Sequence, residues 1–173
     1  IEGVERDLPL FEVAPGLRIA VFNLLGDTEI VEAAARGLAR RLQDLDHDVL
    51  VTAETKSVPL VYELARVLGR PWVVLRKNYK SYMGETITAT TESITTGHEQ
   101  TLHLDEKDVA LIADLRAVLV DDVLTTGSTL AGMRTIVRQA GGTVVGEAVV
   151  FTEGDMQDAE GVVSLGHLPL FTG

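Results

Sequence analysis

Short apolar runs alternate along the chain with longer segments of mixed polarity. The runs predict buried strands at 17–22, 48–53, 72–76, 116–121, 143–151 and 162–165. The mixed segments predict helices over 28–44, 57–69 and 129–140. Because strands alternate with helices, the pattern predicts an α/β fold with a mostly parallel sheet covered on both faces.

Several predicted helix ends carry residues with known end preferences. Asp27 or Thr28 can cap the first helix, and Arg40 and Arg41 stand near its negative end. Gly69 follows the second helix, as glycine often does at helix ends. These residues support the predicted boundaries independently of the apolar pattern.

Residues 78–105 do not follow the α/β pattern. The segment is rich in threonine and poor in apolar residues, and Thr96-Gly97 separates two strand-like stretches. This composition predicts a long, exposed β-hairpin. We find no internal repeat or linker, so we expect a single domain over 1–173 in which the hairpin at about 78–105 has a functional role.

Composition excludes several classes of protein. The chain has 173 residues, 46% of them hydrophobic, and no cysteine, which excludes a disulfide scaffold, a thiol nucleophile and an iron–sulfur cluster. A net charge of −11 disfavours nonspecific nucleic-acid binding, because phosphate backbones recruit basic surfaces. No apolar run approaches the roughly 20 residues of a membrane helix, and no signal peptide is evident. We therefore expect a cytoplasmic protein with no nucleic-acid or membrane partner.

The charge is unevenly distributed. Between Lys56 and Lys80 the chain carries six cationic residues and one acid, Glu63, which gives this window a charge of +5. A basic island in an acidic protein suits a small polyanion better than a long nucleic acid. A solvated helix face followed by a polar loop would explain the island equally well.

The segment 117–130, AVLVDDVLTTGSTL, carries the strongest chemical signal. An apolar strand delivers Asp121 and Asp122 at its carboxyl end, and a hydroxyl-rich loop with Gly127 then opens a helix. Such a loop suits a phosphate, because helix N–H groups point at the anion and the helix dipole favours negative charge. The two acids suit sugar hydroxyls or a magnesium ion. The chain contains neither G-x-x-x-x-G-K-[ST] nor G-x-G-x-x-G, which disfavours P-loop and Rossmann nucleotide sites.

VLVDDVLTTGST resembles the phosphoribosyl pyrophosphate (PRPP) signature of the type I phosphoribosyltransferases. VTAETKSV at 51–58 is similar to the pyrophosphate-binding loop of their purine branch, and VVLRK at 73–77 resembles that branch's next strand. The resemblance covers about residues 17–165, and TATTESITT leans towards adenine and xanthine enzymes. It implies their α/β fold, a mostly parallel sheet flanked by helices, with a flexible β-hairpin lid and a small hood.

The resemblance also implies a role for individual residues. The catalytic pair that would hold the ribose hydroxyls is Asp121 and Asp122. The residues that would cradle the 5′-phosphate are Thr125, Thr126, Gly127, Ser128 and Thr129. Those that would bind pyrophosphate are Thr55, Lys56, Ser57, Arg76, Lys77 and Lys80. The candidates for contact with the base are Asn23, Leu24, Leu25 and Phe151, with Phe151 and Phe22 also suited to core packing.

The implied reaction transfers the phosphoribosyl group of PRPP to a purine base and releases pyrophosphate. The implied partners are PRPP, a purine base and a second copy in a homodimer. The implied cofactor is Mg²⁺, held mainly by PRPP oxygens and water, with no direct protein ligand. We expect the hairpin to exclude water from the reacting centre.

The purine base stays open at this point. The adenine branch carries a glutamate in the hairpin, and Thr95 is the nearest match here, so either adenine or a 6-oxopurine such as xanthine fits. A non-catalytic PRPP sensor is a second interpretation, although a transcriptional regulator would need a DNA-binding segment for which we find neither room nor charge. An unrelated phosphate-binding domain whose acids bind metal is a third, which leaves the 51–58 match unexplained.

Overall fold

The computed structural model describes residues 1–92 and 99–172. Its centre is a five-stranded sheet in the order β4-β3-β7-β8-β9, in which every neighbouring pair is parallel. The strands are β3 (Val49–Ala53), β4 (Trp72–Leu75), β7 (Arg116–Leu124), β8 (Thr143–Glu153) and β9 (Val162–Leu168). The predicted α/β fold and parallel sheet are confirmed.

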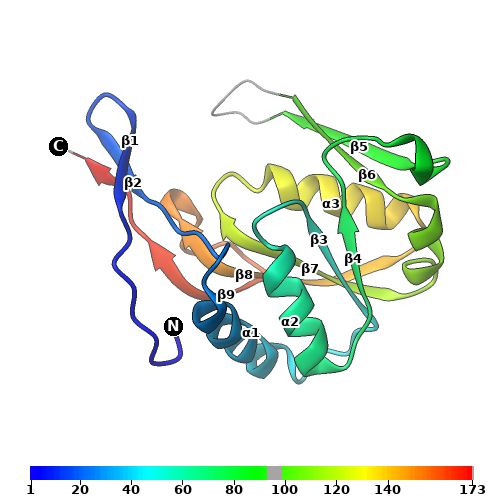
Figure 1. Cartoon of the computed structure of the whole chain (residues 1–173), viewed down its shortest axis with the longest axis horizontal. Coiled ribbons are helices and arrows are strands. Elements are labelled where there is room, and N and C mark those ends of the chain that lie inside the picture. Colours follow the sequence, from blue (N-terminus) through cyan, green and yellow to red (C-terminus); the bar gives the residue numbers. More distant parts are fainter. Residues whose placement is uncertain (93–98, 173) are drawn as a thin grey trace.

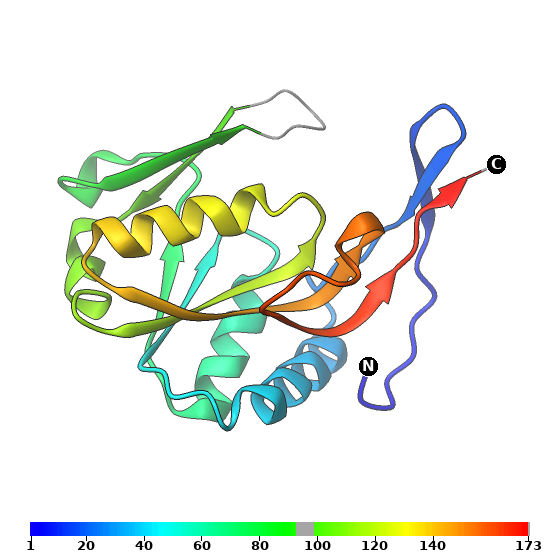
Figure 2. The same ribbon diagram turned by 180° about the vertical axis from the view of Figure 1, so that it is seen from behind.

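Helices cover both faces of this sheet (Figures 1 and 2). The helices are α1 (Thr28–Leu42) and α2 (Val58–Leu68) on one face and α3 (Ser128–Gln139) on the other. Side chains of β7 alternate between the two cores: Val118 and Val120 pack with α1 and α2, whereas Ala117 and Leu119 pack with α3. None of the described helices is long and apolar enough to cross a bilayer.

The predicted helix ends are present. The Asp27 side chain accepts a hydrogen bond from the Ile30 backbone N–H at 3.2 Å, as an N-cap does. Gly69 ends α2 with a φ of +64°, a conformation that glycine adopts without strain.

A small antiparallel sheet stands beside the main one and forms the expected hood (Figure 1). Its strands are β1 (Leu10–Ala14), β2 (Leu17–Ala20) and β10 (Phe171–Thr172). The first four residues of the apolar run at 17–22 therefore form strand β2 of the hood, and the run is not a strand of the parallel sheet. The apolar pattern did not reveal β1, because all five of its residues are exposed, and β10 is too short for a pattern.

The predicted hairpin consists of β5 (Ile87–Glu92) and β6 (Glu99–Leu104), which pair antiparallel and lie over α3 (Figure 2). The expectation that few apolar residues anchor it is wrong, because Ala89, Leu102 and Leu104 are buried in the core beneath it. The turn predicted at Thr96-Gly97 lies outside the described residues. Short 3₁₀ turns flank the hairpin and follow β8: η1 (Ser81–Met83), η2 (Glu106–Leu111) and η3 (Gly154–Met156).

Gly132 of α3 permits this close packing. A Cβ atom at that position would lie 3.0 Å from Thr91 Cγ2 and 3.2 Å from Leu102 Cδ1. The hairpin therefore approaches α3 where the helix has no side chain.

The central position of β7 gives a test of the fold. Leu119 is completely buried, so Leu119→Ala should lower the free energy of unfolding by about 2–5 kcal/mol, through lost transfer energy and a cavity. Urea denaturation followed by circular dichroism measures the change. Val67→Ala is the control: Val67 is 42% exposed on α2, and its truncation should change the same quantity by less than about 0.5 kcal/mol. Equal losses in the two variants would contradict this description of the core.

Candidate active site

The carboxyl ends of β3, β7 and β8 meet at one edge of the parallel sheet. β7 continues through Leu124. Asp121 and Asp122 therefore lie inside the strand, close to its carboxyl end, and not just beyond it. Asp121 is in register with Val149 of β8. In open α/β sheets, ligands bind beyond this edge.

The loop after β7 leads directly into α3. Gly127 has a φ of +77°, which a residue with a side chain rarely adopts, and it is followed by the first helical residue, Ser128. The Thr126 hydroxyl donates to Ser128 Oγ at 3.1 Å. The structure brings all five residues of the predicted phosphate cradle, 125–129, around one small hollow that Asp121 also lines. The first N–H groups of a helix have no intrahelical partner and are available to an anion.

A second loop, 54–57, joins β3 to α2. Thr55 and Lys56 are exposed there, and the peptide bond between Glu54 and Thr55 is cis. Ser57, by contrast, is only 2% exposed. Of the three loop residues predicted to bind pyrophosphate, two therefore face solvent and one faces the protein.

The Ser57 hydroxyl connects this loop to the paired acids. It donates a hydrogen bond to Asp121 Oδ1 at 2.7 Å and accepts one from the Asp122 backbone N–H at 3.1 Å. The Asp121 carboxylate also accepts from the Asp122 N–H at 2.9 Å. The 54–57 loop thus lies within hydrogen-bonding distance of the paired acids of β7.

Burial raises the pKa of Asp121 above its ordinary value, and the neighbouring charge of Asp122 raises it further. The hydrogen bond from Ser57 opposes this shift, because it stabilises the ionised carboxylate. Asp121 therefore holds a proton more readily than a solvated aspartate would.

The remaining cations predicted to bind pyrophosphate differ in their surroundings. Arg76 forms an ion pair with Glu54, and the Lys77 backbone N–H donates to Glu54 Oε2 at 2.9 Å. Lys77 and Lys80 are exposed. The sequence analysis did not identify Glu54 as the partner of Arg76 and of the Lys77 backbone. Its only signal was the presence of an acid two positions before Lys56 in the loop.

The predicted base contacts are not gathered in one place. Leu24 is completely buried in the core, so its side chain packs there. Asn23 is exposed and its side chain accepts from the Leu25 N–H at 3.1 Å, while Leu25 is 45% exposed.

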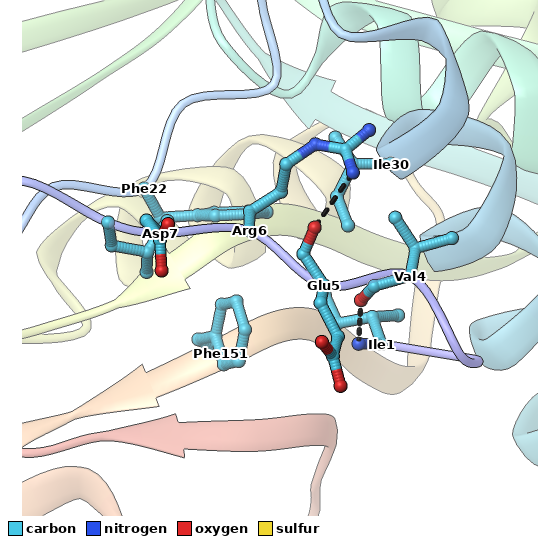
Figure 3. A pocket seen from close by; sticks show the side chains of 9 residues that line it. Ile1, Val4, Glu5, Arg6, Asp7, Phe22, Ile30 and Phe151 are labelled. Carbon is cyan, nitrogen blue, oxygen red and sulfur yellow. Dashed lines mark hydrogen bonds between the residues drawn. The ribbon is translucent and has the colours of Figure 1, made fainter.

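Phe151 lies against Phe22, with ring centroids 4.9 Å apart and planes at 86°. Both rings line a hollow of about 510 Å³ beneath the N-terminal segment (Figure 3). Arg6 holds that segment to α1 through hydrogen bonds of 2.7 Å to both Asp27 and Glu29.

No three histidine, aspartate or glutamate side chains converge as a metal site would require within residues 1–92 and 99–172. The donors that the described edge offers are the two neighbouring carboxylates of Asp121 and Asp122. Mg²⁺ in proteins commonly combines one or two carboxylates or waters with substrate phosphate oxygens. The edge therefore fits a magnesium ion that arrives with a phosphorylated substrate.

Paired acids, a hydroxyl-rich loop that opens a helix and a cation-bearing loop lie at one edge of the parallel sheet of this α/β domain. The family model described as "Phosphoribosyl transferase domain" matches residues 23–162, and the chain belongs to this family. The resemblance drawn from the sequence is thereby confirmed.

The chain is similar in sequence to several curated relatives and in fold to several solved structures. The chain is 30% identical over 149 residues to a probable purine biosynthesis transcriptional regulator, PurR, of Streptococcus pneumoniae, a match covering 86% of this chain and 53% of the regulator. It is 30% identical over 146 residues to the adenine phosphoribosyltransferase of Clostridium botulinum, covering 84% and 80%. The crystal structure of adenine phosphoribosyltransferase from Thermoanaerobacter pseudethanolicus superposes with a TM-score of 0.78 at 23% identity, covering 93% and 95%. The chain spans about half the length of the PurR regulator that it matches.

The raised pKa of Asp121 predicts a pH-dependent effect on stability. In the folded chain Asp121 keeps its proton at pH values where an aspartate of the unfolded chain, with a pKa near 4, has lost it. The contribution of Asp121 to the free energy of unfolding of the wild type therefore falls as the pH rises above about 4. Asp121→Asn removes the titration. The variant should therefore gain stability over the wild type, and the gain should be larger at pH 8 than at pH 5.

Urea denaturation at the two pH values measures this difference. Asp155→Asn, in the turn after β8, is a control that removes one carboxylate elsewhere. A gain for Asp121→Asn that is the same at pH 5 and pH 8 would show that Asp121 titrates normally.

Proposed function

We propose that this chain is a purine phosphoribosyltransferase, which transfers the phosphoribosyl group of PRPP to a purine base and yields a nucleoside monophosphate and pyrophosphate. The observation that carries the proposal is the contact between the 54–57 loop and the paired acids. The hydrogen bond from Ser57 to Asp121, 2.7 Å long, puts a cation-bearing loop beside paired acids and a phosphate cradle. PRPP carries a diphosphate, ribose hydroxyls and a 5′-phosphate in the same order.

In this reaction the C1–O bond to pyrophosphate breaks with its electron pair leaving on oxygen. A purine nitrogen forms the new C1–N bond, and the proton that this nitrogen carried is released to water. The Asp121 and Asp122 carboxylates accept hydrogen bonds from the ribose hydroxyls and fix the sugar. The 125–129 loop and the α3 N-terminus hold the 5′-phosphate. Lys56 stabilises the negative charge that develops on the leaving group.

Mg²⁺ bound with the diphosphate would neutralise part of its charge. Arg76, Lys77 and Lys80 extend the same positive field, although Arg76 must share its charge with Glu54. The β5–β6 hairpin and the hood flank this edge, and we assign the hairpin to covering the reacting centre. Thr95, at the position of the adenine-branch glutamate, lies outside the described residues.

Two classes of base suit the proposal, adenine and the 6-oxopurines. The relative named adenine phosphoribosyltransferase supports adenine, and the relative named hypoxanthine/guanine phosphoribosyltransferase supports a 6-oxopurine. Asn23, Leu25 and Phe151 remain the proposed contacts, with Phe22 added because its ring lines the same hollow as that of Phe151. We further propose a homodimer, as the sequence resemblance implies, and a cytoplasmic location, as expected from the composition.

A non-catalytic PRPP sensor is the second candidate function. The 30% identity with a purine biosynthesis regulator supports it, because the match extends over 86% of this chain. Both functions need the PRPP site described above, so turnover is what separates them.

A panel of bases decides between the two functions. With PRPP and Mg²⁺, we expect pyrophosphate release with adenine, hypoxanthine, guanine or xanthine, and none with orotate. Asp122→Asn should lower turnover at least tenfold, about 1.4 kcal/mol, in a folded variant. Tight PRPP binding without pyrophosphate release for any base would favour the sensor.

Lys56 provides a separate test of the pyrophosphate loop. Lys56→Ala should weaken binding of PRPP and pyrophosphate about tenfold and leave ribose 5-phosphate binding unchanged, because only the diphosphate meets this side chain. Isothermal titration calorimetry measures the three affinities. Arg138→Ala removes a matched charge from the last turn of α3, about 15 Å along the helix from its first residue, and should change none of them. Equal weakening for ribose 5-phosphate would place Lys56 elsewhere.

A further inference from the structure

Ser57 links the 54–57 loop to the paired acids of β7, and the proposed function assigns these to different groups of PRPP, the diphosphate and the ribose. It belongs to the 54–57 loop after β3, whereas its hydrogen-bond partners, Asp121 and Asp122, belong to β7, 64 and 65 residues further along the chain. Its Oγ lies 2.7 Å from Asp121 Oδ1 and 3.1 Å from the Asp122 backbone nitrogen. At 2% exposure, it is enclosed by protein.

These bonds occupy the serine hydroxyl. A hydroxyl has one donor, and here that donor is used by the Asp121 carboxylate. The Asp122 backbone N–H occupies an acceptor position of the same hydroxyl oxygen. The Ser57 hydroxyl therefore acts on Asp121 and is not free to donate to a diphosphate.

The backbone of Ser57 is also firmly held. Ser57 directly precedes α2, and its carbonyl accepts the Val61 N–H at 2.9 Å. Val61, Leu60 and Leu64 of that helix are completely buried. A displacement of Ser57 must therefore move the first turn of α2 with it, and it reaches the Asp121 carboxylate through the hydrogen bond from the serine hydroxyl.

We infer that Ser57 is a positioning residue that couples the pyrophosphate loop to the ribose-binding acids, so that the diphosphate and the ribose of PRPP bind cooperatively. The inference rests on the proposed function and adds to it a residue whose side chain touches neither of these two groups. Coupling of this kind is reciprocal: a diphosphate that orders the loop orients Asp121, and a ribose that orients Asp121 orders the loop.

A purely structural role makes a different prediction. If Ser57 only satisfied a buried polar site, its loss would lower stability and affect all ligands alike. Thr52 provides that comparison within the same pair of strands. Its buried hydroxyl donates to the Val120 carbonyl at 2.7 Å, one residue before Asp121, and touches neither acid.

The experiment compares three ligands in three variants. Calorimetry with Mg²⁺ gives the affinities for PRPP, pyrophosphate and ribose 5-phosphate in Ser57→Ala, Ser57→Thr and Thr52→Val. Ser57 has a φ of −81°, which alanine adopts without strain, so Ser57→Ala should fold. We expect it to weaken PRPP about tenfold while each fragment weakens no more than about twofold, within the usual range of coupling.

Ser57→Thr keeps the hydroxyl and should restore most of the PRPP affinity. Thr52→Val should lower stability without changing the ratio between PRPP and fragment affinities. In an Asp121→Asn background, Ser57→Ala should have little further effect, because the two residues act as one unit. Circular dichroism confirms that every variant is folded.

A measurement without ligand tests the same link. In the free protein, carboxyl-carbon NMR should show a higher pKa for Asp121 in Ser57→Ala than in the wild type, since the ionised carboxylate loses its donor. Thr52→Val should leave that pKa unchanged.

The outcomes separate the inference from the function on which it rests. A wild-type protein that does not bind PRPP overturns the proposed function and the coupling with it. A wild type that binds PRPP, combined with equal losses for PRPP and its fragments in Ser57→Ala, overturns the coupling alone. An unchanged Asp121 pKa in that variant does the same.

Discussion

Parallel pairing of β3, β7 and β8 is the constraint on which the site depends. Parallel strands must all end at the same edge of a sheet, so each crossover through α2 or α3 starts from that edge. The 54–57 loop and the 125–129 loop are consequently neighbours although about 70 residues separate them in the sequence. The pairing of these three strands, and not the conformation of either loop, brings the groups of the two loops to the same edge.

The acid pair shows what this arrangement demands energetically. Burial raises the pKa of Asp121 and so disfavours its ionised form, and the neighbouring charge of Asp122 adds to this effect. A chain selected for stability alone would place an amide or an apolar residue there. The fold tolerates the unfavourable free energy of this buried acid because the strand that carries it is well packed: Val118, Leu119 and Val120 are completely buried. The site is thus carried by the most stable part of the molecule.

The sequence predicted the parallel sheet, the three helices and the two ligand-binding loops, because each has a local signature: apolar runs, capping residues, or a hydroxyl-rich loop beside paired acids. It did not predict the hood strand β1, whose exposed residues lack alternation, or the anchoring of the hairpin by Leu102 and Leu104. The ion pair of Arg76 with Glu54 and the hydrogen bond from Ser57 to Asp121 also escaped prediction. Both join residues far apart in the sequence or on different elements, and such contacts leave no periodic trace.

The packing of the hairpin on α3 has a mechanical consequence. α3 begins at Ser128, beside the phosphate cradle, and Gly132, where β5 and β6 touch the helix, comes one turn later, about 6 Å along its axis. Over so short a length an α-helix behaves as a rigid rod. A displacement of the first turn of α3 therefore moves the helix surface that Thr91 and Leu102 of the hairpin contact, so the 125–129 loop and the hairpin are mechanically connected.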